Sequence, residues 1–195
     1  MTKEWFAYKL YVYDLDDTLY RETDYLFAAY ARIAAACTAD KAEQETYTTY
    51  LCESFAEEGR QGLFQRFQAK YGVKLSLDEM LHILRHTQCP LRLFETREQE
   101  IKELLHRGKK VAVVTNGNPE QQRQKVRNLG LKELFPQIEV VYAADIESKP
   151  SPRVINDLLS AFQTDRSDVL LIGDSETDRL TVSNAGIDYR SINEK

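Results

Sequence analysis

Two carboxylates stand two residues apart at the end of an apolar run near the start of the chain. Residues 9–13 are mostly aromatic and β-branched, which favours a buried strand, and Asp14 and Asp16 follow directly. Charges inside a buried strand are costly, so both side chains are expected at its carboxyl end, where open α/β sheets bind ligands. Such a pair can supply a nucleophile together with a general acid and base. Taken alone, the pair also fits an acidic turn that only ends a strand.

Three later segments also join apolar or helical stretches to polar residues that can do chemistry. Residues 111–114 lead into a hydroxyl and an amide side chain, and the Asn-Pro pair that follows is typical of a helix start. A lysine precedes a second proline-initiated helix, and residues 169–172 lead into two further carboxylates. Each segment is common by itself, but their order along the chain is hard to reach by chance. The polar residues of these segments are Thr115, Asn116, Lys149, Asp174 and Asp178.

With these motifs in this order, the chain resembles the haloacid dehalogenase superfamily of aspartate-nucleophile hydrolases and phosphatases. The resemblance runs from Asp14 to Asp178, while residues 20–90 match only in length and helical character. It implies a magnesium-dependent phosphatase that hydrolyses a small phosphomonoester, of the nucleotide or sugar phosphate class, through an aspartyl-phosphate. It also implies that Mg²⁺ is held by the Asp14 side chain, the backbone carbonyl of Asp16 and Asp174. Asp178 would then lie one turn further along, as a water-bridged or more distant partner.

Phosphoryl transfer needs an in-line nucleophile, neutralised phosphoryl oxygens and help for the leaving group. We assign the nucleophile to Asp14, and proton transfer to and from the leaving group and water to Asp16. Several acids near a dianionic phosphate would repel it, and a magnesium ion removes that objection. Thr115 and the backbone amide of Asn116 are expected to grip phosphoryl oxygens. Lys149 adds a compact positive charge that can pair with both phosphate and Asp14.

The elements that must position these residues show two different patterns of apolar residues. Residues 91–195 alternate between near-continuous apolar strands and helices, which indicates a parallel sheet covered on both faces, and the first strand belongs with them. Residues from about 23 to 90 contain only helical periodicity, with a capping box at 76–79. We therefore expect an α/β fold in which residues 1–19 and 91–195 form a Rossmann-like parallel sheet core. Residues 20–90 are expected to form an inserted α-helical cap that closes over the site as a lid.

Composition narrows the class of partner. The chain has 195 residues, 43% of them hydrophobic, and a formal net charge of −5, which argues against a nucleic-acid-binding surface. It has no signal-peptide hydrophobic region and no apolar stretch near the ~20 residues that span a bilayer. Its three cysteines are widely spaced and odd in number, so no disulfide framework or zinc site is indicated. We expect a cytoplasmic enzyme for a small phosphorylated metabolite, with neither nucleic acid nor membrane as a partner.

Asp16 separates the activities found within the superfamily. Dehalogenases displace halide, which needs no proton, and typically lack an acid at this position, so Asp16 favours phosphate ester hydrolysis over carbon–halogen cleavage. Phosphomutases share the same motifs and stay open as an alternative. A catalytically silent scaffold that uses the fold to bind a partner is a third alternative, because a fold alone does not prove activity.

Overall fold

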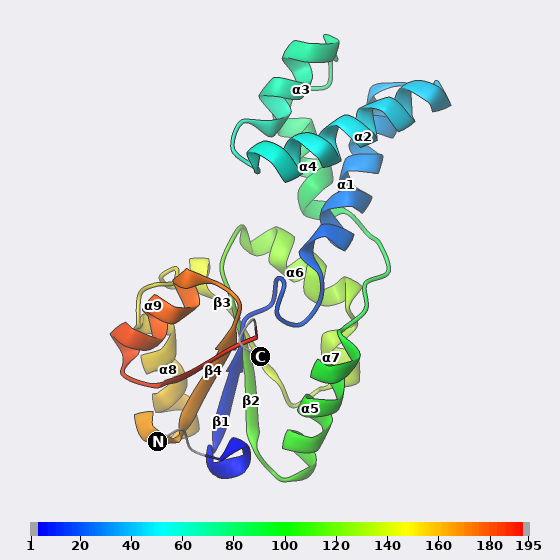
Figure 1. Ribbon diagram of the computed structural model, residues 1–195. Helices are drawn as coiled ribbons and strands as arrows, with labels where there is room; N and C mark the ends of the chain where they lie inside the picture. Colours follow the sequence, from blue (N-terminus) through cyan, green and yellow to red (C-terminus); the bar gives the residue numbers. More distant parts are fainter. Residues whose placement is uncertain (1–3, 193–195) are drawn as a thin grey trace. The chain divides into compact units, whose positions relative to one another are not determined.

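The computed structural model describes residues 4–192, and the chain divides into two compact units (Figure 1). Unit 1 comprises the described residues up to Arg21 and from Leu91 onward, and unit 2 comprises Glu22–Pro90. The chain therefore leaves unit 1 shortly after its first strand and returns to it after four helices. The backbone N–H of Phe94 donates to the carbonyl of Leu19 at 2.8 Å, so the two connections are joined within unit 1.

Unit 1 is built on a five-stranded, wholly parallel sheet with the order β3-β2-β1-β4-β5. Its strands are β1 (Leu10–Tyr13), β2 (Lys110–Thr115), β3 (Glu139–Tyr142), β4 (Val169–Gly173) and β5 (Asp188–Ser191). In the central strand, Val12 lies opposite both Ala112 and Leu171. Every residue of β1 and β4 is buried, which explains their near-continuous apolar sequences. The α/β class predicted from the sequence is confirmed.

Helices cover both faces of this sheet. They are α5 (Glu95–His106), α6 (Pro119–Asn128), α7 (Leu131–Leu134), α8 (Arg153–Phe162) and α9 (Glu176–Ala185), with short 3₁₀ turns at Trp5–Ala7, Ala143–Asp145 and Arg166–Asp168. Helices α8 and α9 lie on one side of the sheet and α5, α6 and α7 on the other (Figure 1). On the first side, Val12 and Ala112 pack with Ile155 of α8 and Val182 of α9 in a buried apolar cluster. This burial fixes the sheet whose carboxyl edge carries the polar motifs.

Unit 2 is wholly helical within its described elements. It contains α1 (Glu22–Cys37), α2 (Lys41–Glu58), α3 (Leu63–Tyr71) and α4 (Leu77–His86). The predicted capping box is present at the start of α4, where Ser76 and Glu79 bond each other's backbone N–H groups. Tyr47 of α2 packs against Phe67 and Tyr71 of α3 with ring centroids 5.3 and 4.8 Å apart, so aromatic contacts hold these helices together.

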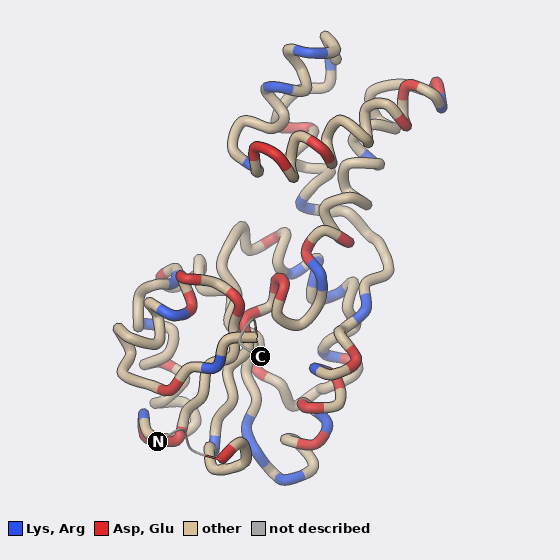
Figure 2. The backbone as a smooth tube through the Cα atoms, in the orientation of Figure 1, with Lys and Arg blue, Asp and Glu red and all other residues tan. Residues whose placement is uncertain are grey.

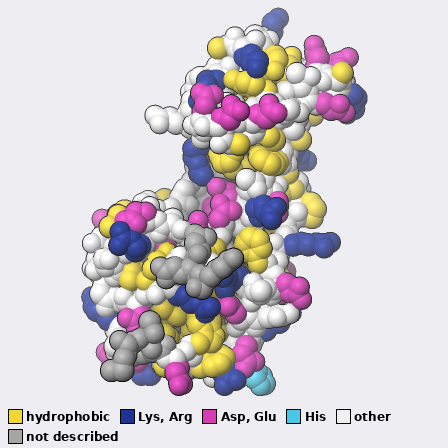
Figure 3. Space-filling model, in the orientation of Figure 1, with side chains coloured by type: hydrophobic (Ala, Val, Ile, Leu, Met, Phe, Trp, Pro, Cys, Tyr) yellow, Lys and Arg dark blue, Asp and Glu magenta, His cyan; other side chains and the backbone are white. Residues whose placement is uncertain are grey.

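Charge is spread over both units. Lys and Arg are interspersed with Asp and Glu along the backbone (Figure 2). On the face shown in Figure 3, the basic side chains of the described residues do not gather into a continuous stripe. Within residues 4–192, no helix has the length and apolar character needed to cross a membrane.

Candidate active site

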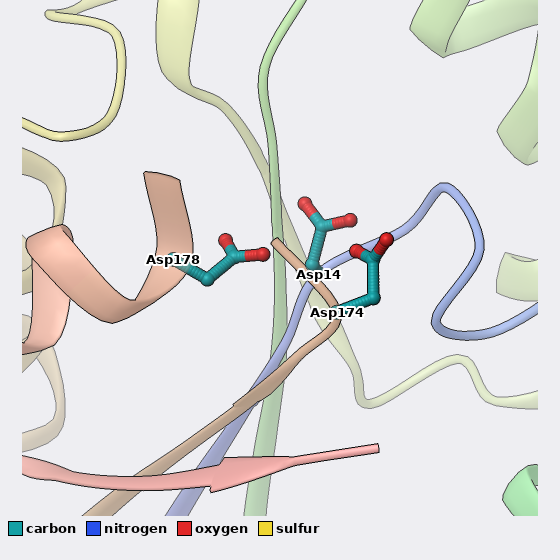
Figure 4. A group of neighbouring side chains, drawn as sticks. All are labelled: Asp14, Asp174 and Asp178. Carbon is teal, nitrogen blue, oxygen red and sulfur yellow. The ribbon is translucent and has the colours of Figure 1, made fainter. Parts of the chain in front are cut away.

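Two aspartates meet where the paired strands β1 and β4 end. Asp14 and Asp174 each follow the last residue of their strand, and the backbone N–H of Asp14 donates to the carbonyl of Ile172 at 2.9 Å. Asp178 approaches from the first turn of α9, with its carboxylate directed toward the other two (Figure 4). Each of the three offers an oxygen atom, and these atoms lie within 4.8 Å of one another. The parallel register of the sheet thus turns residues far apart in sequence into one acidic cluster.

A buried lysine joins this cluster. The Lys149 ammonium lies 2.5 Å from Asp14 Oδ1, 2.6 Å from Asp178 Oδ1 and 3.2 Å from the carbonyl oxygen of Val114. Its backbone is bracketed by the Asn116 side chain, which accepts from the N–H of Lys149 and donates to its carbonyl, both at 2.9 Å. All three ammonium protons therefore have acceptors, and the lysine is fixed at both ends.

The buried charges alter one another's ionisation. Burial raises the pKa of Asp14 to about 7, with the Lys149 ammonium opposing the rise and the Asp178 carboxylate adding to it. Burial also raises the pKa of Asp174, again with a contribution from Asp178. Burial by itself would lower the pKa of Lys149, but the charges of Asp14 and Asp178 outweigh it, and the pKa lies above its ordinary value. The Lys149 ammonium contacts only two of the three clustered carboxylates, Asp14 and Asp178, so the cluster keeps an excess of negative charge that favours a further cation.

The donor set fits Mg²⁺, because hard divalent cations prefer carboxylate oxygens. Asp178 already has protein partners on both oxygens: Oδ1 accepts from Lys149, and Oδ2 accepts from the Ser175 hydroxyl at 2.6 Å in the capping box of α9. A Cβ on Gly173 would lie only 2.6 Å from Asp178 Oδ2, so this close packing requires glycine at the end of β4. Asp14 and Asp174 are therefore the carboxylates best suited to contact a cation directly.

Asp16 belongs to a second hydrogen-bonded group. The Lys125 ammonium lies 2.8 Å from both of its carboxylate oxygens, and the Tyr20 hydroxyl donates to Oδ1 at 2.7 Å. Gln122 Nε2 lies 2.8 Å from Asp16 Oδ2 and 2.6 Å from Thr115 Oγ1. One side-chain amide therefore connects the two residues that were expected to handle protons and phosphate.

The predicted site residues thus fall into two groups, and the members of each group are linked by contacts or lie close together. The first contains Asp14, Asn116, Lys149, Asp174 and Asp178, and the second contains Asp16 and Thr115. The neighbouring Asp17 is exposed and has a positive φ of 52°, so it belongs to the turn.

Sequence reasoning missed Tyr20, Gln122 and Lys125. One available signal was that Gln122 and Lys125 stand three apart in α6, the helix that opens directly after the Thr115 loop, and so share one face of it. The cap of that helix was predicted correctly, since the Asn118 side chain accepts from the N–H groups of Glu120 and Gln121.

Residues 11–192 match the family of haloacid dehalogenase-like hydrolases, and the chain belongs to this family. The resemblance inferred from the motifs is thereby confirmed. A phosphoglycolate phosphatase of Vibrio parahaemolyticus is 30% identical over 142 residues, which cover 72% of this chain and 54% of that enzyme. The chain thus spans about half the length of this curated relative.

Solved structures share the fold at lower identity. A protein from Haemophilus somnus described as a predicted phosphoglycolate phosphatase has a TM-score of 0.64 and 22% identity, covering 96% of this chain and 89% of its own. A protein from Bacillus subtilis described as a haloacid dehalogenase-like (HAD) hydrolase, which was solved bound to magnesium, has a TM-score of 0.59 and 21% identity. The match covers 93% of this chain and 85% of that one.

Proposed function

We propose that this chain is a magnesium-dependent phosphatase that hydrolyses a small phosphomonoester through an aspartyl-phosphate on Asp14. The observation that carries the proposal is the buried contact between the Asp14 carboxylate and the Lys149 ammonium, at the carboxyl edge of the sheet and inside a cluster of acids. The similarity to a phosphoglycolate phosphatase supports the same reaction class. Small phosphorylated acids and sugar phosphates are the substrates that we propose.

The chemistry proceeds in two displacements. Asp14 attacks the phosphorus atom in line, and the bond from phosphorus to the leaving oxygen breaks while Asp16 gives that oxygen a proton. A water molecule then attacks the aspartyl-phosphate, Asp16 takes its proton, and the bond from phosphorus to Asp14 breaks. Inorganic phosphate and the free Asp14 carboxylate are the products. Asp16 thus acts first as acid and then as base, which restores the starting protonation.

Phosphoryl oxygens would be held at the loop between β2 and α6. The Thr115 hydroxyl accepts from Gln122, so its own proton is directed elsewhere, and within the described chain it reaches the carbonyl of Asn116 only at 3.3 Å. A phosphoryl oxygen is a stronger acceptor than this distant carbonyl. The backbone N–H of Asn116 and the Lys149 ammonium complete the group that we propose binds phosphate.

Mg²⁺ would be held by the side chains of Asp14 and Asp174 and the backbone carbonyl of Asp16. When bound, the ion would neutralise charge on the carboxylates and on the phosphoryl oxygens. Asp178 would keep Lys149 in place, because its oxygens already bond the lysine and the cap of α9.

We propose further that unit 2 is a cap. The chain enters it at Glu22, shortly after Asp16, and the bond from Phe94 to Leu19 keeps the return connection beside the outgoing one. A cap attached there can exclude water from the aspartyl-phosphate and select leaving groups. A crystal structure with Mg²⁺ and a phosphate analogue tests this: helices that roof the site support the cap, and helices packed away from Asp14 contradict it.

Phosphate release tests the main proposal. The protein is incubated with nitrophenyl phosphate and a panel of small phosphate esters, with Mg²⁺ or with excess chelator. Magnesium-dependent release of inorganic phosphate supports the phosphatase. Conversion of a sugar phosphate to its isomer without net release would indicate a phosphomutase, release of halide from a haloacid would indicate a dehalogenase, and inertness toward all of them would favour a scaffold.

A further inference from the structure

A second buried lysine stands behind Asp16. Helix α6 contributes Lys125, whose side chain is 0% exposed, whereas the Asp16 side chain is 22% exposed. Taking an ammonium out of water is expensive, and apolar residues of similar volume often stabilise a protein as well as a buried ion pair does. Stability alone therefore gives a weak reason for a lysine here. Its contact with both oxygens of Asp16 instead fixes the plane of that carboxylate.

Gln122 acts from the same helix face. It is 2% exposed, and its Nε2 atom bonds Asp16 Oδ2 and Thr115 Oγ1 at once. A rotation of the Asp16 carboxylate would break this bridge and both contacts with Lys125. Because one amide nitrogen bonds both side chains, a change in the orientation of Asp16 would also disturb Thr115.

We propose that Lys125 and Gln122 are positioning residues for the proton transfers of Asp16. This inference rests on the proposed phosphatase function. Lys125 Nζ bonds both oxygens of Asp16, and Gln122 Nε2 bonds Asp16 and Thr115, so their effect on the reaction passes through the groups that they hold. They fix the Asp16 carboxylate in the orientation from which it exchanges a proton with the leaving oxygen. Gln122 also fixes the position of Asp16 relative to Thr115, the residue that we propose binds phosphoryl oxygens.

The test compares two leaving groups. Lys125→Met and Gln122→Met are assayed with an alkyl phosphate, whose leaving oxygen needs a proton, and with nitrophenyl phosphate, whose leaving group hardly does. We expect kcat for the alkyl ester to fall roughly 10–100-fold more than kcat for nitrophenyl phosphate, because misplacing a general acid costs part of its ~10²–10⁴-fold contribution. Any disturbance of Thr115 by Gln122→Met should lower kcat for both esters alike, so the ratio of the two losses is the quantity compared. Gln124→Met is the matched control: Gln124 is a buried glutamine of α6 whose amide bonds Asn128 on the same helix.

A double variant separates positioning from general structural damage. In an Asp16→Asn background, Lys125→Met should cause little further loss, because the group it positions is already disabled. Equal losses for both esters, or full additivity with Asp16→Asn, would overturn the proposal. If circular dichroism shows that Lys125→Met is unfolded, Gln122→Met, which keeps the ion pair, decides by the same comparison. A wild-type protein without phosphatase activity would rule out the proposed function and this role with it. An active wild type whose variants lose the same factor in kcat for both esters would rule out only the positioning role.

Discussion

The Lys149 ammonium lies 2.5 Å from Oδ1 of Asp14, and the two side chains are only 3% and 11% exposed. Asp178 shares the same ammonium from the other side, and Asn116 holds the lysine backbone. The carboxylate at the end of β1 is therefore oriented by one buried lysine, which two other segments of the chain hold in place. Such preorganisation is what a nucleophile needs, because no reorganisation is then required during attack.

Asp14→Asn should abolish turnover while the fold stays intact. The amide keeps the shape of the carboxylate but cannot form an acyl-phosphate. Phosphate release measures the loss, and circular dichroism checks the fold. Asp17→Asn is the control: Asp17 is exposed with φ 52°, a conformation that asparagine tolerates, so activity should stay within about twofold. Retention of a tenth of wild-type activity by Asp14→Asn would remove it as the nucleophile.

Asp16→Asn should reduce turnover of alkyl phosphates by ~10²–10⁴-fold, the usual contribution of general acid–base catalysis. The substitution keeps the backbone carbonyl for the metal and leaves Asp14 unchanged. The loss should be smaller for nitrophenyl phosphate, whose leaving group is acidic. Steady-state kinetics with both esters check this, and identical losses would argue against an acid role for Asp16.

Magnesium should restore activity after chelation, and calcium should inhibit, because its larger and looser coordination shell misplaces the attacking carboxylate. Asp174→Ala should sharply weaken the apparent magnesium affinity, read from activity as a function of magnesium concentration. Asp157→Ala is the control, since Asp157 forms an exposed pair with Arg153 on α8 and should leave the titration unchanged. Full activity in excess chelator would exclude the metal from the mechanism.

Lys149→Met should lower the free energy of unfolding by about 3–5 kcal/mol, because it leaves Asp14 and Asp178 buried without their shared cation. Magnesium should recover part of this loss by binding the folded state. Urea unfolding with and without magnesium measures both effects.

Lys9→Met is the matched control for that experiment. Lys9 is 67% exposed in its pair with Asp168, and breaking such a surface pair should cost no more than about 1 kcal/mol. Equal destabilisation by the two substitutions would mean that Lys149 does not neutralise buried carboxylates.

Local patterns of apolar and polar residues were enough to predict much of the fold. The apolar run at 111–114 became β2 (Lys110–Thr115), and the run at 169–172 became β4 (Val169–Gly173). Strand and helix periodicity arise from burial of alternate or helically spaced side chains, so short windows suffice to recognise them. The meeting of Asp14 with Asp174 was also predictable, because carboxyl ends of parallel strands lie at one edge of the sheet.

What only the tertiary structure decided is which donors each carboxylate receives. Lys149, which was expected to pair with Asp14, turned out to bond Asp178 as well, and Asp16 turned out to be held by Lys125, which lies 109 residues away in sequence. These contacts depend on how α6 and α9 pack beside the strands, and no short window of sequence records that packing. The sequence by itself determined the fold class and the chemical groups at the sheet edge. Long-range packing determined their pairing, because a hydrogen bond needs its two atoms within about 3 Å, whereas periodicity constrains only which face of an element a residue occupies.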